Sequence, residues 1–361
     1  MRYSNQEKVP QQLDHYRLLG RSGLRISPLT LGTMTFGIPA SWGCDYAEAQ
    51  KVFTRYIERG GNAIDTANFY AEGEAERIVG RLVEGRREQL VIATKYSLSM
   101  RRGDPNASGN HRKNMVQSVE DSLRRLQTDY IDLFYLHMWD STTPAEEVLR
   151  AFDDLVRAGK ILYVGISDTP AWQVSRMQAI AELRGWSPLV ALQIPYSLAE
   201  RTVERDLIPM ALEMGLGVLP WSPLSGGVLS GKYTRDDLQQ STGATFDTRK
   251  DINLATGRLT ESTLAIADEV SAIAREVERS PSQVALAWTL RNRVVVSTLI
   301  GVRNVQQLED NLAALDLVLT DEHCARLNEI SRIEPGFPHD LLSSPAMSSM
   351  FGEVRLAGRN T

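Results

Sequence analysis

Short apolar segments, rich in β-branched and aromatic residues, alternate with longer amphipathic stretches along most of the 361-residue chain. Nearly continuous apolar strands that alternate with helices indicate a parallel sheet whose faces are covered by those helices. Eight consecutive units of this kind fit a closed (β/α)₈ barrel. The eight segments begin at Leu29, Ala63, Leu90, Tyr130, Ile161, Pro188, Gly217 and Val294.

A doubly wound open sheet is the alternative fold, but neither G-x-G-x-x-G nor G-x-x-x-x-G-K-[ST] follows any of the segments. The pattern therefore predicts one α/β domain over residues 1–361, a (β/α)₈ barrel with an N-terminal β-hairpin and long βα loops. The hairpin is expected at about 16–28, with its turn in "RSGL", closing the bottom of the barrel. Long loops follow the third and seventh strands, and a tail at about 334–361 is expected to lie over the surface.

Composition and charge narrow the class of protein. Hydrophobic residues make up 42% and charged residues 24%, with a formal net charge of −5. Such a chain lacks the excess of positive charge that is typical of proteins that bind nucleic acid or an anionic membrane. The polar amino terminus, the lack of a bilayer-length apolar run and two widely spaced cysteines predict a soluble, cytoplasmic protein. The five histidines lack zinc-type spacing, so no metal is expected.

Polar side chains stand where the predicted strands end, which is where the loops of a barrel surround one cavity. Each has an ordinary alternative role when taken alone. An aspartate can cap a turn, a lysine can extend along apolar surface toward water, and a histidine or a tyrosine can belong to the core. Together, at successive strand ends, they predict a site. They are Asp65, Lys95, His137, Ser167, Asp168 and Gln193, with Tyr70 in the loop after the second strand.

Four of these groups suit the reduction of a carbonyl. A tyrosine with a pKa near 10 is a weak acid at neutral pH, and a nearby ammonium such as Lys95 favours its anion and lowers its pKa. Asp65 would keep Lys95 charged and oriented. His137 would polarise the substrate carbonyl while Tyr70 donates a proton to its oxygen as general acid. The hydride has to come from a cofactor, because no side chain supplies one.

The chain resembles the aldo-keto reductase superfamily in seven motifs that occur in the order found in that family. They are "AIDTANFYAEGEAERIVG", "VIATKY", "DYIDLFYLH", "VGISD", "QIPYS", "WSPLSGGVLSGKY" and "LIGVRNVQQLEDN". The likeness extends from about Tyr16 to Leu327. Within the superfamily, the chain is similar to the aryl-alcohol-dehydrogenase-like branch, notably in the motif "GTMTFG". This resemblance implies a barrel that binds NADP(H) without a separate dinucleotide domain. It also implies that Asp65, Tyr70, Lys95 and His137 form the catalytic tetrad.

The resemblance also implies a set of cofactor contacts. Ser167 and Gln193 would bind the carboxamide, Trp221 would stack on the nicotinamide, and Arg303 would face the 2′-phosphate. Two positions depart from the family pattern, because Asp168 stands where asparagine is common and Trp221 where tyrosine is frequent. The full predicted set is Gly32, Thr33, Met34, Asp65, Ser167, Asp168, Gln193, Trp221, Ser222, Pro223, Leu224, Gly226, Lys232, Gly301, Arg303, Gln307, Asp310 and Asn311.

The expected activity is reversible, NADPH-dependent reduction of an aldehyde or ketone, which makes the partner a small carbonyl or alcohol. Phe36, Trp42, Tyr96 and Trp139 are predicted to line the substrate pocket and favour a flat apolar substrate, although all four also suit a core. The basic residues in "MRRGDPNASGNHR" are also compatible with a different substrate, one that is sugar-like or anionic. The alternative function, which the resemblance also allows, is a cofactor-binding auxiliary subunit of the potassium-channel type with little turnover.

Overall fold

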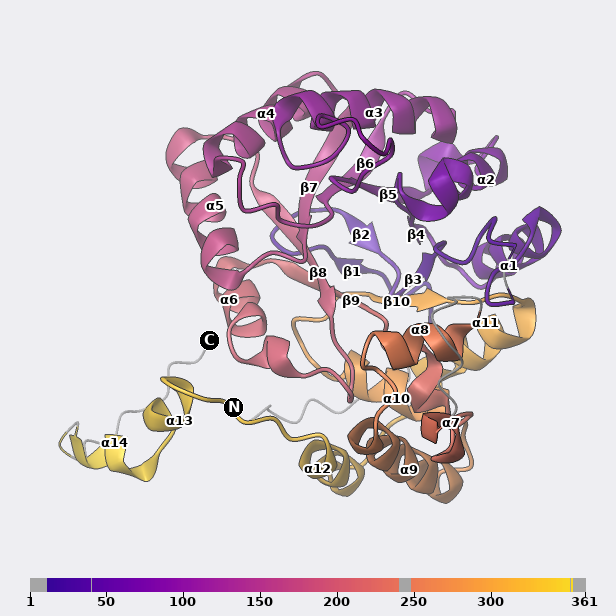
Figure 1. The fold of residues 1–361 in the computed structure, drawn as a ribbon, viewed down its shortest axis with the longest axis vertical. Helices are drawn as coiled ribbons and strands as arrows, with labels where there is room; N and C mark the ends of the chain where they lie inside the picture. Colours follow the sequence, from indigo (N-terminus) through magenta and orange to yellow (C-terminus); the bar gives the residue numbers. More distant parts are fainter. Residues whose placement is uncertain (1–11, 40, 240–247, 351, 353–361) are drawn as a thin grey trace.

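Eight parallel strands form a barrel at the centre of the molecule, with helices around it (Figure 1). The computed structural model describes residues 12–39, 41–239, 248–350 and 352. The strand order β10-β3-β4-β5-β6-β7-β8-β9 follows the chain, apart from β10, as the alternating pattern predicted. The strands are β3 (Leu29–Gly32), β4 (Ala63–Asp65), β5 (Val91–Tyr96), β6 (Ile131–Leu136), β7 (Ile161–Ser167), β8 (Leu189–Pro195), β9 (Gly217–Trp221) and β10 (Thr298–Gly301).

The last apolar segment closes the barrel by pairing with two different strands. Its first part lies beside β9, where the Val218 N–H donates to the Val294 carbonyl at 2.9 Å and the Val296 N–H donates to the Val218 carbonyl at 3.0 Å. Its second part, β10, pairs in parallel with β3. The prediction of one continuous strand from Val294 is therefore corrected to a bridge and a shorter strand.

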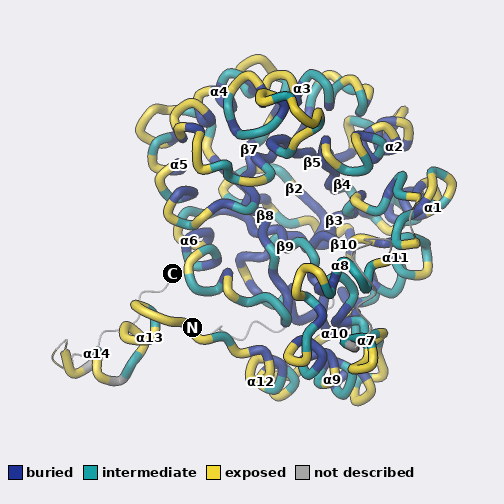
Figure 2. Tube along the Cα trace, in the orientation of Figure 1, coloured by how far each residue is buried: buried dark blue, intermediate teal, exposed yellow. Residues whose placement is uncertain are grey.

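The strands are mostly buried on both faces, which is why their sequences are largely apolar (Figure 2). Alternate side chains such as Ala93 and Leu133 fill the barrel, while their neighbours Ile92 and Phe134 pack outward beneath the helices. The surrounding helices are α1 (Tyr46–Glu58), α2 (Glu74–Leu82), α3 (Arg112–Leu126), α4 (Ala145–Arg157), α5 (Ala171–Arg184), α6 (Leu207–Met214), α9 (Glu261–Glu276), α10 (Pro281–Leu290), α11 (Val305–Leu312) and α12 (Asp321–Ile330).

A two-stranded hairpin, β1 (Arg17–Leu18) with β2 (Arg25–Ile26), lies across the strand ring in Figure 1. Leu19 and Ile26 are buried among the inward-facing side chains of the barrel. Gly20 has a φ of +55°, and a Cβ there would approach the Val190 carbonyl oxygen to 2.4 Å. The close approach of the hairpin to the strands thus depends on glycine. The hairpin closes the barrel end as predicted.

Two further predicted segments are described in part. The long connection after β9 contains α7 (Asp236–Gln239) and α8 (Arg249–Ala255), and residues 240–247 lie outside the described residues. The tail passes α6, where Arg205 donates to the Glu334 carbonyl at 2.6 Å. It then forms α13 (His339–Leu342) and α14 (Pro345–Met350), which project from the barrel in Figure 1, while 351 and 353–361 are outside the described residues. Within those described ranges, every helix is too short or too polar to span a bilayer.

Candidate active site

The four predicted catalytic side chains meet at the carboxyl end of the barrel strands. Asp65 is the last residue of β4, Lys95 lies near the end of β5, and His137 directly follows β6. Tyr70 stands in the short 3₁₀ turn after β4. The Tyr70 hydroxyl lies 3.5 Å from the Lys95 Nζ, and the rings of Tyr70 and His137 meet edge to face with centroids 6.0 Å apart.

Lys95 and Asp65 form an ion pair inside the protein. The Lys95 Nζ donates to the Asp65 Oδ1 at 2.5 Å and to the Thr66 carbonyl at 2.8 Å, and both charged side chains are almost completely buried. The second Asp65 oxygen accepts from the Gln193 Nε2 at 2.8 Å. Burial opposes the ammonium, but the charge of Asp65 and the hydrogen bonds to Asp65 and Tyr70 outweigh it, so the pKa of Lys95 rises above its usual value. Lys95 therefore presents a fixed positive charge to Tyr70.

The turn that carries Tyr70 has an unusual backbone. Ala71 and Glu72 have φ values of 47° and 54°, and Gly73 follows at 87°. Left-handed conformations cost energy for residues with a Cβ and cluster at functional sites. This turn directs the phenol back over the barrel, where it lines the cavity described below.

Burial shapes the protonation of the site. It raises the pKa of Tyr70 above 10.0, and the opposing charge of Lys95 only reduces this rise. The ammonium of Lys95 acts to lower the phenol pKa, as expected, but the loss of water, which the sequence did not predict, outweighs it. Burial, with repulsion from Lys95, lowers the pKa of His137 to about 3. His137 is thus neutral, and Tyr70 holds its proton, at neutral pH.

A cavity of about 480 Å³ extends from these groups to the β10–α11 loop. It is lined by every residue predicted to contact the cofactor. These residues are Gly32, Thr33, Met34, Asp65, Ser167, Asp168, Gln193, Trp221, Ser222, Pro223, Leu224, Gly226, Lys232, Gly301, Arg303, Gln307, Asp310 and Asn311.

The structure adds Arg249 to this lining, a residue that the sequence did not single out. Its guanidinium lies 5.4 Å from the ring centroid of Trp42, which also lines the cavity. Within the described residues, Lys232, Arg249 and Arg303 make no ion pair with a carboxylate. The pKa of Lys232 is lowered by burial and by the charges of Arg303 and Arg249. Three uncompensated cations on one wall suit a polyanionic ligand such as a phosphorylated dinucleotide.

Only one of the four predicted substrate residues, Trp42, lines the cavity. Phe36 and Tyr96 are buried in the core, and Trp139 packs against it. Tyr96 points outward because its strand neighbour Lys95 points inward. Its ring stacks on Phe134 at 5.3 Å. These three assignments are therefore corrected. The described lining supplies Phe69 and Leu98 as further apolar side chains.

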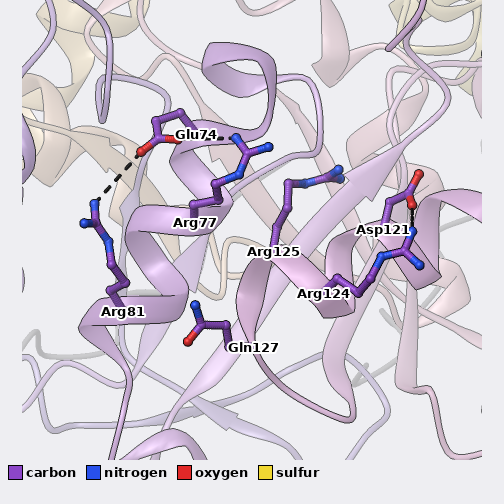
Figure 3. A pocket seen from close by; sticks show the side chains of 7 residues that line it. All are labelled: Glu74, Arg77, Arg81, Asp121, Arg124, Arg125 and Gln127. Carbon is purple, nitrogen blue, oxygen red and sulfur yellow. Dashed lines mark hydrogen bonds and ion pairs between the residues drawn. The ribbon is translucent and has the colours of Figure 1, made fainter.

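A second cleft, between α2 and α3, lies outside this site (Figure 3). It is lined mainly by arginines, but Arg77 and Arg81 face Glu74, and Arg124 is paired with Asp121. Arg125 binds the buried Glu76 at 2.6 Å, and its side chain fills the space beside Gly73. This contact secures the start of α2 and with it the Tyr70 turn.

Known proteins resemble this chain over most of its length. The model of the aldo/keto reductase family matches residues 28–332. Norsolorinic acid reductase of Aspergillus flavus is 37% identical over 92% of this chain and 85% of its own length. Aryl-alcohol dehydrogenase [NADP(+)] of Phanerodontia chrysosporium is 36% identical over 91% of this chain and 89% of its own. YrpG, an uncharacterized oxidoreductase of Bacillus subtilis, is 38% identical over 87% of this chain and 95% of its own length.

Three observations indicate the same family: the order of the strands, the polar groups at their ends and the matches to known proteins. The chain belongs to the aldo/keto reductase family of oxidoreductases, in its aryl-alcohol-dehydrogenase-like branch.

Proposed function

We propose that the protein reduces an aldehyde or ketone reversibly to an alcohol, using NADPH. The observation that carries this proposal is the Tyr70 hydroxyl on the cavity wall, 3.5 Å from the ammonium of Lys95. A protonated phenol beside a fixed positive charge is suited to donating a proton to an oxygen on which negative charge develops.

Each member of the site has a distinct task in this proposal. Tyr70 donates its proton to the carbonyl oxygen, and Lys95 stabilises the resulting phenolate. Asp65, held by Gln193, fixes the position of the Lys95 ammonium. His137, neutral at physiological pH, orients the carbonyl through hydrogen bonding. The nicotinamide supplies the hydride when it is bound.

The residues present fit a phosphorylated dinucleotide. Gly226 and Gly227 have φ values of 64° and 90° beside the cavity, where their missing side chains leave the backbone accessible. Lys232, Arg249 and Arg303 supply positive charge for phosphates. The preference for NADP over NAD is supported by these cations and by the name of the Phanerodontia relative, which includes NADP(+).

Apolar side chains indicate a flat, largely hydrophobic carbonyl substrate. Trp42, Phe69 and Leu98 line the cavity together with the ring of Tyr70. Aromatic faces of this kind favour stacking with an aromatic substrate. The relative named for aryl alcohols supports the same class.

The proposal is tested by following NADPH consumption with aromatic aldehydes, aliphatic ketones and keto-sugars. We expect the highest kcat/KM with aromatic aldehydes, and alcohol oxidation with the corresponding benzylic alcohols. NADPH binding without turnover of any of these carbonyls would contradict the proposed enzyme and would favour the auxiliary-subunit alternative.

Replacing Arg303 with alanine should weaken NADPH binding much more than NADH binding. A charge-assisted hydrogen bond to a phosphate contributes about 1.5–3 kcal/mol, which corresponds to roughly 10- to 150-fold in Kd. Fluorescence titration of both cofactors measures the effect. Arg293→Ala removes an exposed guanidinium outside the cavity and is the matched control. Equal losses of affinity for NADPH and NADH would contradict a contact with the 2′-phosphate.

The pH profiles of the two reaction directions should differ. Because the pKa of Tyr70 lies above 10.0, reduction should keep its proton donor up to that pH and decline only above it. Alcohol oxidation needs the phenolate, so its rate should rise about tenfold per pH unit from pH 7 toward the Tyr70 pKa. His137, with a pKa of about 3, should add no transition between pH 5 and 9. A reduction rate that falls between pH 7 and 9 would contradict this assignment of the proton donor.

A further inference from the structure

Asp168 places a carboxylate in the cavity directly after β7. Its backbone φ of 35° lies in the left-handed region, which aspartate and asparagine tolerate better than most residues. The Oδ1 accepts a hydrogen bond from the Trp221 Nε1 at 3.1 Å, and the Asp168 carbonyl accepts one from the Trp139 N–H at 3.3 Å. The Trp221 hydrogen bond therefore holds the carboxylate beside the indole, and the loop after β6 holds the backbone of Asp168.

This carboxylate contributes to the charge at the reactive end of the cavity. The charges of Asp65 and Lys95 offset each other at 2.5 Å, and His137 is neutral. Among the described residues, no lysine, arginine or histidine forms an ion pair with Asp168. Burial raises the pKa of Asp168, while the Trp221 hydrogen bond and the charge of Lys95 act in the opposite direction and favour the ionised form. Arg258 also lies beside this indole, with its guanidinium 5.5 Å from the Trp221 ring centroid. Replacing Asp168 with an uncharged residue would therefore remove a negative charge from a site that also holds a cation.

We infer that Asp168 makes the site favour the oxidised cofactor, so that the equilibrium between the bound ligands is shifted toward NADP⁺ and alcohol, the direction of carbonyl reduction, relative to a chain with an amide at position 168. The inference rests on the proposed function, with the nicotinamide bound between Tyr70 and Trp221. The nicotinamide ring is positively charged when oxidised and neutral when reduced. A fixed carboxylate nearby attracts only the charged form, whereas an asparagine of the same shape does not.

The expected size of the effect follows from charge interactions in a partly buried site. For unit charges several ångströms apart and partly shielded by solvent, the attraction corresponds to about a tenfold change in the ratio of the two affinities. The same ratio sets the equilibrium between the bound oxidised and reduced forms, because binding and redox equilibria are thermodynamically linked. Asp168 is therefore proposed as a residue that shifts the equilibrium on the protein toward the oxidised cofactor and the alcohol.

The test is to measure the Kd of NADP⁺ and of NADPH separately for the native protein and for Asp168→Asn at neutral pH. We expect the Kd of NADP⁺ to rise about tenfold in the variant while that of NADPH changes about twofold or less. Asp168→Glu, which keeps the charge, should retain a lower Kd for NADP⁺ than Asp168→Asn. Asp129→Asn, an exposed position outside the cavity, is the matched control.

The outcomes separate this inference from the proposed function. If the native protein binds both cofactor forms but Asp168→Asn shifts both affinities equally, or neither, the charge effect is overturned and the proposed function stands. If the native protein binds neither form, both proposals fail. Asn is nearly isosteric with Asp and its amide oxygen can still accept the Trp221 N–H. Should Asp168→Asn nevertheless fail to fold, Asp168→Ser, which also removes the charge, tests the same ratio.

Discussion

Replacing Tyr70 with phenylalanine is expected to lower kcat for carbonyl reduction by about 10²- to 10⁴-fold, the range for loss of a positioned general acid. The phenyl ring keeps the edge-to-face contact with His137, whose centroid lies 6.0 Å away. Only the hydroxyl is lost, so the Kd of NADPH should remain close to that of the native protein. Single-turnover rates and cofactor titration together separate the chemical step from binding.

Tyr16→Phe is the matched control, because the exposed Tyr16 hydroxyl donates only to the Gly60 carbonyl, at 3.0 Å, and lies outside the cavity. This variant should keep native turnover. A Tyr70→Phe protein with unchanged kcat would remove Tyr70 from the role of proton donor, whatever its affinity for NADPH.

Replacing Lys95 with methionine should both inactivate and destabilise the protein. The side chain is completely buried, and its removal leaves the Asp65 carboxylate without its cation inside the barrel. Breaking a buried ion pair by removing one partner costs about 3–5 kcal/mol in the free energy of unfolding. Urea denaturation measures this loss, and NADPH consumption measures the loss of activity.

Two companion variants make this prediction specific. Lys113→Met changes an exposed lysine on α3 and should leave the unfolding midpoint near the native value. The double variant Asp65→Asn with Lys95→Met removes both charges, so it should recover part of the lost stability but no activity. If the Lys95→Met variant has the same urea midpoint of unfolding as the native protein, the ion pair does not stabilise the protein as argued.

The barrel could be predicted because its constraints are local and repeated. The strand segments are largely apolar, and polar residues stand at or just after the ends of several of them, which places Asp65, Lys95 and His137 on one end of the barrel by topology alone. The division of the last segment at Ser297 was not predictable. Every residue from Val294 to Ile300 is compatible with a strand, and only the closed geometry decides which neighbour each part pairs with.

Side-chain direction and burial account for the other differences at the site. The assignment of Tyr96 to the substrate wall overlooked strand alternation, since a functional Lys95 already required its neighbour to face the helices. Arg249 lies far along the chain from Trp42 and reaches the cavity only because α8 begins beside it. The upward shift in the Tyr70 pKa depends on how much water the fold excludes, a quantity that no sequence motif reports.

The β1–β2 hairpin has a consequence for the order in which ligands arrive. Leu19 and Ile26 seal the amino-terminal end of the barrel, so the cavity is reached from the opposite end. A dinucleotide and a carbonyl compound would then use the same entrance to the cavity. The ligand that binds deeper in the cavity would have to bind first and dissociate last. Release of the deeper ligand would thus require the outer part of the cavity to be empty, which delays its departure in each cycle.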